Sequence, residues 1–94
     1  MMFVQVNSSE CYDLKRVSSV RVRSIKEDEN YRFEFLIDGK VVLSIPQSSF
    51  PEGTELRDVT KAFAFFMMQD GASEHHLYYT LDQFIECLKY ELLR

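Results

Sequence analysis

The stretch from Tyr31 to Pro46, YRFEFLIDGKVVLSIP, constrains the fold more than any other part of the sequence. Apolar and polar side chains alternate along YRFEFLI, and a second apolar run, KVVLSIP, follows after Asp38 and Gly39. Alternation with a period of two is the pattern of a strand with one buried face, and an Asp-Gly pair between two such runs is typical of a β-hairpin. The stretch therefore predicts two antiparallel strands, Tyr31–Ile37 and Lys40–Pro46.

The register of this hairpin can be tested, because a shift of one residue exchanges the two faces of a strand. A two-residue turn at Asp38 and Gly39 would set Phe33 opposite Ser44 and so mix the apolar and polar sets. A three-residue loop, residues 37–39, instead sets Tyr31, Phe33 and Phe35 opposite Ile45, Leu43 and Val41. That loop also gives Gly39 the left-handed position of a bulged turn, so we predict the three-residue loop.

A third alternating run, Val17–Ile25, predicts a strand before the hairpin. A four-residue loop, Glu27 to Asn30, sets Arg23 opposite Glu34, which is a favourable cross-strand pair. A five-residue loop would turn the arginines of this run into the aromatic face, where an unpaired charge is costly. Met2–Val6 predicts a short fourth strand, and the polar link NSSECYDL after it has room for one helical turn.

The second half of the chain has the periodicity of helices. Thr54 is placed to cap a helix that runs to about Gln69, and Gly71 is placed to end it. A last helix begins at Thr80, where TLDQ has the capping-box pattern. Each helix has an apolar stripe. The stripe of the first helix is Leu56, Val59, Phe63, Phe66 and Met67. The stripe of the last helix is Leu81, Phe84, Ile85, Leu88 and Leu92. We predict one α+β domain, residues 1–94: an antiparallel meander of three to four strands with two C-terminal helices packed on one face.

The predicted register divides the sheet into an apolar face and a basic face. The apolar face, covered by the helices, carries Val20, Val22, Phe33, Phe35, Val41, Leu43 and Ile45. The basic face carries Arg21, Arg23, Ile25, Arg32, Glu34, Leu36, Lys40, Val42 and Ser44. Four positive residues against one negative residue make this face basic, although the chain as a whole has a net charge of −4.

The basic face has three interpretations. It is a solvated sheet face, or a protein-binding surface in which Ile25, Leu36 and Val42 add apolar contact, or a nucleic-acid platform. A platform needs aromatic rings on which bases stack, and the predicted register turns the aromatic rings inward. A competing register would bring aromatic rings and arginines together, so the nucleic-acid interpretation stays open.

The negative charge lies in the second half, where residues 51–94 carry four Lys or Arg and eight Asp or Glu. Asp58, Glu74, Asp82 and Glu86 give the helices an acidic character that suits the basic groove of a partner. An acidic total argues against general nucleic-acid binding. Phe65 and Met68 lie off the main stripe of the first helix, so they either pack against the neighbouring helix or form a homodimer contact.

The sequence contains few residues of the types that bind metals or act in catalysis. Cys11 and Cys87 lack the CxxC spacing and the companions of a zinc site, and no secretory signal is evident. We expect both cysteines to be reduced and the protein to be cytoplasmic. His75 and His76 are adjacent, so their side chains diverge by about 100° on a helix and rarely bind one ion. No metal, cofactor or catalytic residue is predicted.

We interpret the stretch GASEHHLYYT, residues 71–80, as the connector between the helices, with Tyr78 and Tyr79 anchoring it. The chain is expected to be a small acidic protein without enzymatic activity that binds another protein, as an inhibitor, immunity factor or adaptor does. One alternative is a nucleic-acid binder that uses the arginine-bearing sheet face. A second alternative is a small hydrolase that uses the loop of His75 and His76, with Cys87 as a nucleophile paired to a histidine.

Overall fold

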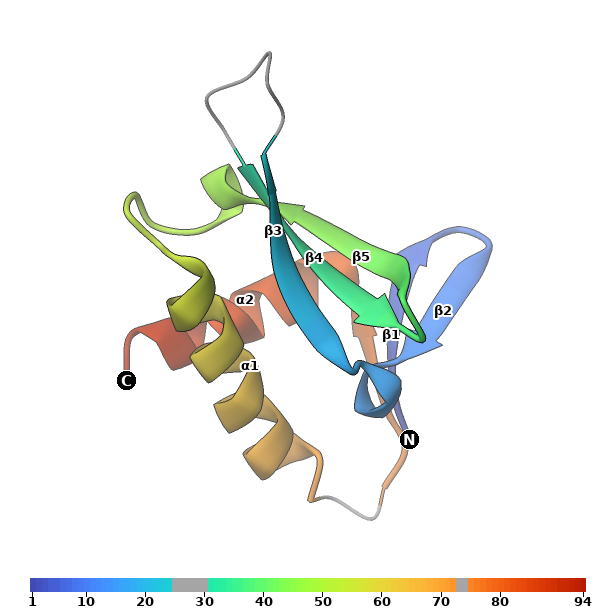
Figure 1. Ribbon diagram of the computed structural model, residues 1–94. Helices are drawn as coiled ribbons and strands as arrows, with labels where there is room; N and C mark the ends of the chain where they lie inside the picture. Colours follow the sequence, from blue (N-terminus) through green and yellow to red (C-terminus); the bar gives the residue numbers. More distant parts are fainter. Residues whose placement is uncertain (25–30, 73–74) are drawn as a thin grey trace.

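The computed structural model describes residues 1–24, 31–72 and 75–94. In chain order its elements are β1 (Met2–Asn7), β2 (Glu10–Asp13), β3 (Ser19–Ser24), β4 (Tyr31–Ile37), β5 (Lys40–Pro46), α1 (Leu56–Asp70), β6 (Leu77–Thr80) and α2 (Leu81–Leu92) (Figure 1). Two short 3₁₀ turns, Leu14–Arg16 and Gln47–Ser49, complete the order. The predicted α+β class is confirmed, and so is the antiparallel meander, which is β3-β4-β5.

Within the described residues the strands form two three-stranded sheets, where the sequence predicted one. In the second sheet, β1 is central: it pairs with β2 in antiparallel and with β6 in parallel orientation. The predicted strand Met2–Val6 is therefore real but lies outside the meander. The polar link after it, in which a helical turn was expected, contains β2, and the 3₁₀ turn follows only from Leu14. Backbone pairing with β1 holds β2 as a strand, although its own side chains do not alternate clearly.

The turn between β4 and β5 differs from the prediction. Ile37 pairs with Lys40, so Asp38 and Gly39 form a two-residue turn, with φ of 50° and 78°. A bulge follows, at which β5 has one residue more than β4, and it brings Phe35 opposite a leucine. The predicted three-residue loop is wrong, because the bulge rather than a longer loop restores the apolar pairing.

The register of β3 against β4 is shifted by two residues from the prediction. Arg21 lies opposite Glu34, and Arg23 lies opposite Arg32. A shift of two residues keeps every side chain on its predicted face. Among the described residues the pairs extend to Ser24 opposite Tyr31, and the predicted loop 27–30 lies outside the described residues. Val22, which was expected under the helices, is 37% exposed, since β3 is an edge strand.

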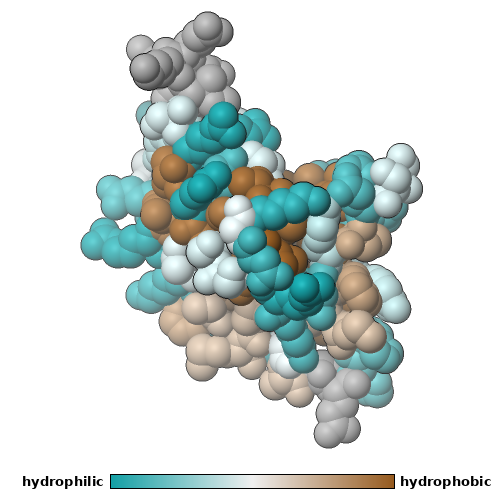
Figure 2. All heavy atoms as spheres, turned by 45° about the vertical axis from the view of Figure 1, so that its right-hand side comes forward, coloured by the Kyte–Doolittle hydropathy of each residue, from teal (hydrophilic) through white to brown (hydrophobic). Residues whose placement is uncertain are grey.

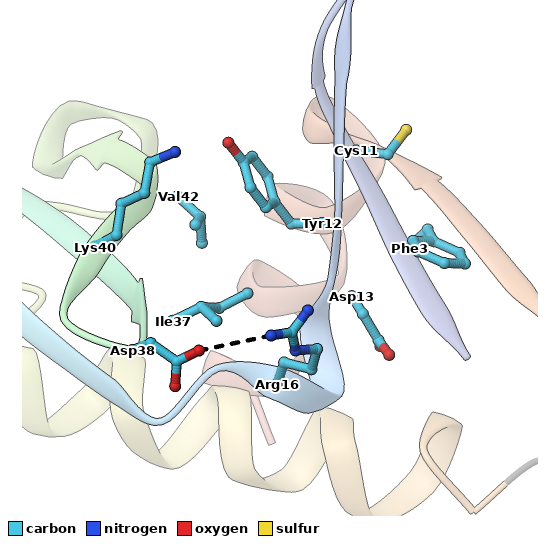
Figure 3. Close-up of a pocket in the computed structure, with 9 residues that line it drawn as sticks. All are labelled: Phe3, Cys11, Tyr12, Asp13, Arg16, Ile37, Asp38, Lys40 and Val42. Carbon is cyan, nitrogen blue, oxygen red and sulfur yellow. Dashed lines mark ion pairs between the residues drawn. The ribbon is translucent and has the colours of Figure 1, made fainter.

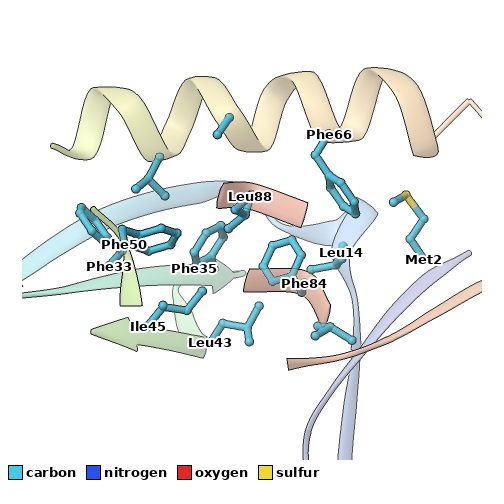
Figure 4. Packing of buried hydrophobic residues seen from close by; sticks show 13 residues of the cluster. Met2, Leu14, Phe33, Phe35, Leu43, Ile45, Phe50, Phe66, Phe84 and Leu88 are labelled. Carbon is cyan, nitrogen blue, oxygen red and sulfur yellow. The ribbon is translucent and has the colours of Figure 1, made fainter. Parts of the chain in front are cut away.

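One hydrophobic cluster joins both sheets and both helices (Figure 4). Phe84 of α2 lies near its centre and is fully buried. Its ring meets those of Phe35, Phe63 and Phe66 at centroid distances of 5.7, 6.0 and 5.5 Å, each in an edge-on arrangement. Such edge-on contacts between aromatic rings are favourable beyond the burial of their area. The predicted stripes of both helices thus pack on the apolar side of the meander.

The start of α1 differs from the predicted one. The hydroxyl of Thr54, the predicted cap, donates a hydrogen bond of 2.6 Å to the carbonyl of Pro51. Glu55 occupies the cap position, and its backbone N–H donates to the side chain of Asp58 at 2.9 Å. The helix therefore begins at Leu56, because Thr54 belongs to the preceding turn.

The start of α2 is as predicted. The N–H of Gln83 donates to the hydroxyl oxygen of Thr80 at 3.1 Å, and the N–H of Thr80 donates to the side chain of Gln83 at 2.9 Å. These two bonds are the reciprocal pair of a capping box. The end of α1 at Asp70 also agrees with the prediction, although Gly71 caps it in the right-handed conformation, with φ of −67°.

Candidate interaction surface

Three arginines on β3 and β4, Arg21, Arg23 and Arg32, form what we call the arginine face. Arg21 Nε lies 2.8 Å from one carboxylate oxygen of Glu34, and Arg23 Nη1 lies 3.8 Å from the other. The Glu34 side chain is only 5% exposed, whereas those of Arg21 and Arg23 are 55% and 66% exposed. The carboxylate is thus buried beneath the arginines, which keep their charged ends in solvent.

Arg32 is held by a different partner. Its Nε donates to the Ser44 hydroxyl oxygen at 2.7 Å, and its Nη2 donates to the Ser44 carbonyl at 3.0 Å. Arg32 also lies directly opposite Arg23, and like charges at opposite positions of two strands are unfavourable. Glu34 offsets part of that repulsion, yet three positive charges against one negative charge leave the face positive.

The structure corrects the expectation of apolar contacts between these arginines. Leu36 is 4% exposed and Val42 is 8% exposed, so neither presents a surface to a partner. Val42 lies at the bulge in β5 and lines a cleft between the two sheets. Ile25, which was expected on the same face, lies outside the described residues. The contacts that the arginine face offers are therefore mainly polar.

The aromatic side chains of β4 turn away from the arginines. Phe33 and Phe35 are fully buried, and the Tyr31 hydroxyl donates to the carbonyl of Thr54 at 2.9 Å. The predicted inward orientation is confirmed. Because stacking on aromatic rings is how most platforms hold unpaired bases, these three residues do not supply that element of a nucleic-acid platform on the arginine face.

The predicted acidic residues do not form one patch. Asp58 caps α1, whereas Asp82 and Glu86 lie on α2, and Glu74 lies outside the described residues. Glu86 forms an exposed ion pair with Lys89 at 3.2 Å. The predicted dimer residues, Phe65 and Met68 on α1, are 40% and 70% exposed, so neither is packed in the core.

A cleft of about 500 Å³, which no sequence pattern predicts, lies between the two sheets. Figure 3 shows Ile37 and Val42 directed into it from the meander, with Tyr12 entering from β2. Arg16 and Asp38 form an exposed ion pair of 3.5 Å at its edge. Figure 2 brings this side of the molecule forward and shows hydrophobic atoms between hydrophilic side chains rather than a broad apolar surface.

The cleft has no preferred ligand charge. Arg16 and Lys40 contribute two positive charges to its lining, and Asp13 and Asp38 contribute two negative charges. Asp13 already accepts hydrogen bonds from two backbone N–H groups, at 3.3 and 3.1 Å. Lys40 belongs to this cleft rather than to the arginine face, on which the sequence had placed it.

Cys87 lies on α2 in a chemically unfavourable place for a nucleophile. Burial raises the pKa of its thiol, and the nearby carboxylates of Asp70, Glu91 and Glu86 raise that pKa further. A thiol with a raised pKa carries little of the reactive thiolate at neutral pH. The raised pKa concerns Cys87 alone, and the alternative of a small hydrolase that uses the loop of His75 and His76 stays a prediction.

The connector before α2 contains a strand that was not predicted. Leu77–Thr80 forms β6, in which Tyr79 points inward and Tyr78 outward. The Tyr79 hydroxyl donates to Asp70 at 2.6 Å, while Tyr78 stacks on Phe3 with a centroid distance of 5.6 Å. The tyrosines do anchor the segment, as expected. The sequence LYYT has strand-forming tyrosines but no alternation of apolar and polar residues, and four residues are too few to separate a strand from a loop.

Comparison of the chain with family models, with curated proteins and with solved structures finds no match. Within residues 1–24, 31–72 and 75–94, no group of three or more His, Cys, Asp or Glu side chains is arranged to hold a metal ion. No helix in the described part of the chain is long and apolar enough to cross a membrane. Inferences about function thus rest on the surfaces described above.

Proposed function

We propose that the chain is a small non-enzymatic protein that binds an acidic surface of another protein through its arginine face and masks that surface. The observation that carries this proposal is the arrangement of Arg21 and Arg23 over the buried carboxylate of Glu34. An inhibitor, an immunity factor and an adaptor all act in this way.

The rigidity of the arginine face supports binding. Arg21 and Arg23 share Glu34, and Arg32 is held by two hydrogen bonds to Ser44, so all three side chains are partly ordered before a partner arrives. Ordering long side chains in advance lowers the entropy that binding costs. A guanidinium also matches the geometry of a carboxylate through two parallel hydrogen bonds. Aspartate and glutamate side chains of a partner are the groups that fit best.

The acidic residues of the helices are weaker candidates for the contact. Asp58 is engaged in capping α1, and Asp82 and Glu86 lie on the other helix, so these carboxylates do not form one acidic patch. The arginine face, in contrast, keeps net positive charge after its internal pairs are counted. Because Leu36 and Val42 are buried, we expect the contact to be polar and its affinity to fall as salt increases.

The test compares the natural chain with the triple variant Arg21→Gln, Arg23→Gln, Arg32→Gln. Proteins from an extract of the source cells are captured on each, and the binding of the recovered partner is then titrated directly. We expect at least about a tenfold loss of affinity, because interface arginines are often energetic centres. The matched control, Lys15→Gln, Arg57→Gln, Lys61→Gln, removes the same charge elsewhere and should bind normally.

Two results would contradict the proposal. Equal loss in both triple variants would mean that only net charge matters, and the arginine face would have no special role. Binding of single-stranded RNA or DNA at low salt, lost in the arginine variant alone, would assign the face to nucleic acid instead.

The proposal also places the protein in the cytoplasm, where its two free thiols, Cys11 and Cys87, would stay reduced.

Self-association is a separate part of the proposal and concerns Phe65 and Met68. Both side chains are exposed on α1, and two copies could meet through this pair in a symmetric contact. Two side chains alone bury much less than the roughly 1,000 Å² of a stable interface, so we expect a weak dimer. Sedimentation of the natural chain and of Phe65→Ser, Met68→Ser over a range of concentrations tests this contact.

A further inference from the structure

A groove follows the outward side of α2, away from the arginine face. Two adjoining hollows of about 490 and 330 Å³ make it up, and both are lined by Glu86 and Cys87. The first hollow extends to β6 and the second to the end of α1. We call this surface the tyrosine groove; its lining is Phe66, Gln69, Asp70, Tyr78, Tyr79, Asp82, Gln83, Glu86, Cys87, Tyr90 and Glu91.

Two of the most exposed aromatic side chains of the molecule lie in this groove. Tyr78 is 71% exposed and Tyr90 is 67% exposed. Tyr78 is nevertheless fixed in place, since its ring stacks on Phe3 with an interplanar angle of 17°. Aromatic rings that stay this exposed beside a hollow are informative, because apolar area of this kind often marks a binding site. The Tyr78 face that is turned away from Phe3, and the exposed ring of Tyr90, are available to a ligand.

The charge of the groove has one sign. Its lining includes the carboxylates of Asp70, Asp82, Glu86 and Glu91 and no lysine or arginine. Asp70 and Glu91 are engaged with Tyr79 and Arg94. Asp82 and Glu86 are exposed, and the Glu86 pair with Lys89 is a surface pair of the kind that contributes little and exchanges readily.

The tyrosine rings and the carboxylates of the groove together favour a positively charged ligand. A guanidinium or ammonium group is attracted to the face of an aromatic ring and forms charge-assisted hydrogen bonds with carboxylates. We propose that the tyrosine groove binds a short basic segment of a partner protein, which places arginine or lysine side chains against Tyr78 and Tyr90. From Asp82 to Tyr90 the helix rises about 12 Å, a length that three to four extended residues span.

The test is an amide NMR titration with a synthetic peptide, acetyl-Ala-Arg-Ala-Arg-Ala-amide. We expect the largest shifts at residues 78–90 and at Asp70. The variant Asp82→Asn, Glu86→Gln should weaken binding at least fivefold, and Tyr90→Leu, which keeps the apolar area but removes the ring, should weaken it as well. The matched control, Asp38→Asn, Glu52→Gln, removes two exposed carboxylates outside the groove and should leave binding unchanged.

Several outcomes would overturn the inference. A peptide with citrulline in place of arginine, which has the shape without the charge, must bind much more weakly; equal binding would refute a cation site. Shifts spread over the whole surface, or equal loss in the control variant, would indicate attraction to net negative charge only. Groove shifts that depend on protein concentration without peptide would assign the groove to a second copy of the chain. Variants that lose spectral dispersion would be replaced by the single substitution Glu86→Gln.

Discussion

At the scale of single residues, Glu34 shows what alternation in the sequence can and cannot reveal. Its place on the outer face of β4 could be predicted, because Phe33 and Phe35 on either side of it face the core. Its burial could not be predicted, since a carboxylate on an outer face is usually solvated. Arg21 and Arg23 cover it, and that cover depends on a register that differs by two residues from the predicted one.

The substitution Glu34→Gln tests this pair. The amide keeps the shape of the carboxylate but removes its charge, so Arg21 and Arg23 lose their shared partner. We expect the free energy of unfolding to fall by about 1.5–3 kcal/mol, the range for hydrogen bonds to charged groups. Urea denaturation measures the change. Glu52→Gln, at an exposed loop position, should change stability very little; equal effects of the two substitutions would show that Glu34 has no structural role.

Tyr79→Phe tests the hydrogen bond to Asp70 and its dependence on pH. Removal of the bond should lower the free energy of unfolding at neutral pH by about 1 kcal/mol. Burial and Asp70 raise the pKa of Tyr79, so the folded protein keeps the phenolic proton where the unfolded chain loses it. This contribution to stability is complete below the unfolded pKa of about 10 and is lost as the pH rises above it.

The two proteins should therefore differ in how their stability changes with pH. The natural chain should lose more stability between pH 7 and about pH 11 than Tyr79→Phe does. Urea denaturation at both pH values gives the comparison. Parallel loss of stability in both proteins would show that Tyr79 does not titrate differently in the folded state.

At the scale of elements, long periodic segments could be predicted and short ones could not. The α2 cap at Thr80 follows from residues that are neighbours in the sequence, so its signal is local. The strands β2 and β6 have four residues each and depend on pairing with β1, a contact that no local pattern encodes. The bulge in β5 also could not be predicted from a local pattern. It allows a two-residue turn at one end of the hairpin while Phe33 and Phe35 still pair with apolar residues of β5.

Thr80→Ala tests the local signal. Loss of the hydroxyl leaves the N–H of Gln83 without its cap acceptor, and we expect a destabilisation of about 1 kcal/mol. Thermal unfolding followed by circular dichroism measures it. Thr60→Ala, the same change at an exposed position inside α1, should be neutral or stabilising because alanine is the better helix former. A neutral Thr80→Ala would mean that β6, rather than the cap, fixes the start of α2.

At the scale of the whole molecule, the sequence predicts the contents of the core better than its surfaces. The apolar stripes of both helices could be read from their periods, and they meet in the cluster around Phe84. The tyrosine groove could not be predicted, because it forms between two elements. Strand β6, which the sequence did not predict, places Tyr78 beside the outward face of α2. A surface of this kind depends on how two elements pack together, and the pattern within each element does not encode that packing.

The two sheets are joined chiefly through that core, and this arrangement predicts how they unfold. Phe84 meets Phe35 of the meander and Phe66, whose ring in turn meets Tyr79 of the second sheet at 5.4 Å. Phe84→Leu should therefore destabilise both sheets, by about 1–2 kcal/mol. Hydrogen exchange of the amides of Val4 in β1 and Phe35 in β4 measures each sheet separately.

Equal loss of protection at the two amides would show that the sheets unfold as one cooperative unit. Phe65→Leu makes the same chemical change at a ring that is 40% exposed and should leave both amides nearly unaffected. Loss of protection confined to Phe35 would contradict the prediction, since the second sheet would then be stable without the packing of Phe84. In that case β1, β2 and β6 would form a unit held mainly by their own backbone hydrogen bonds, and the tyrosine groove, which spans β6 and α2, would depend on Phe84 only through the helix.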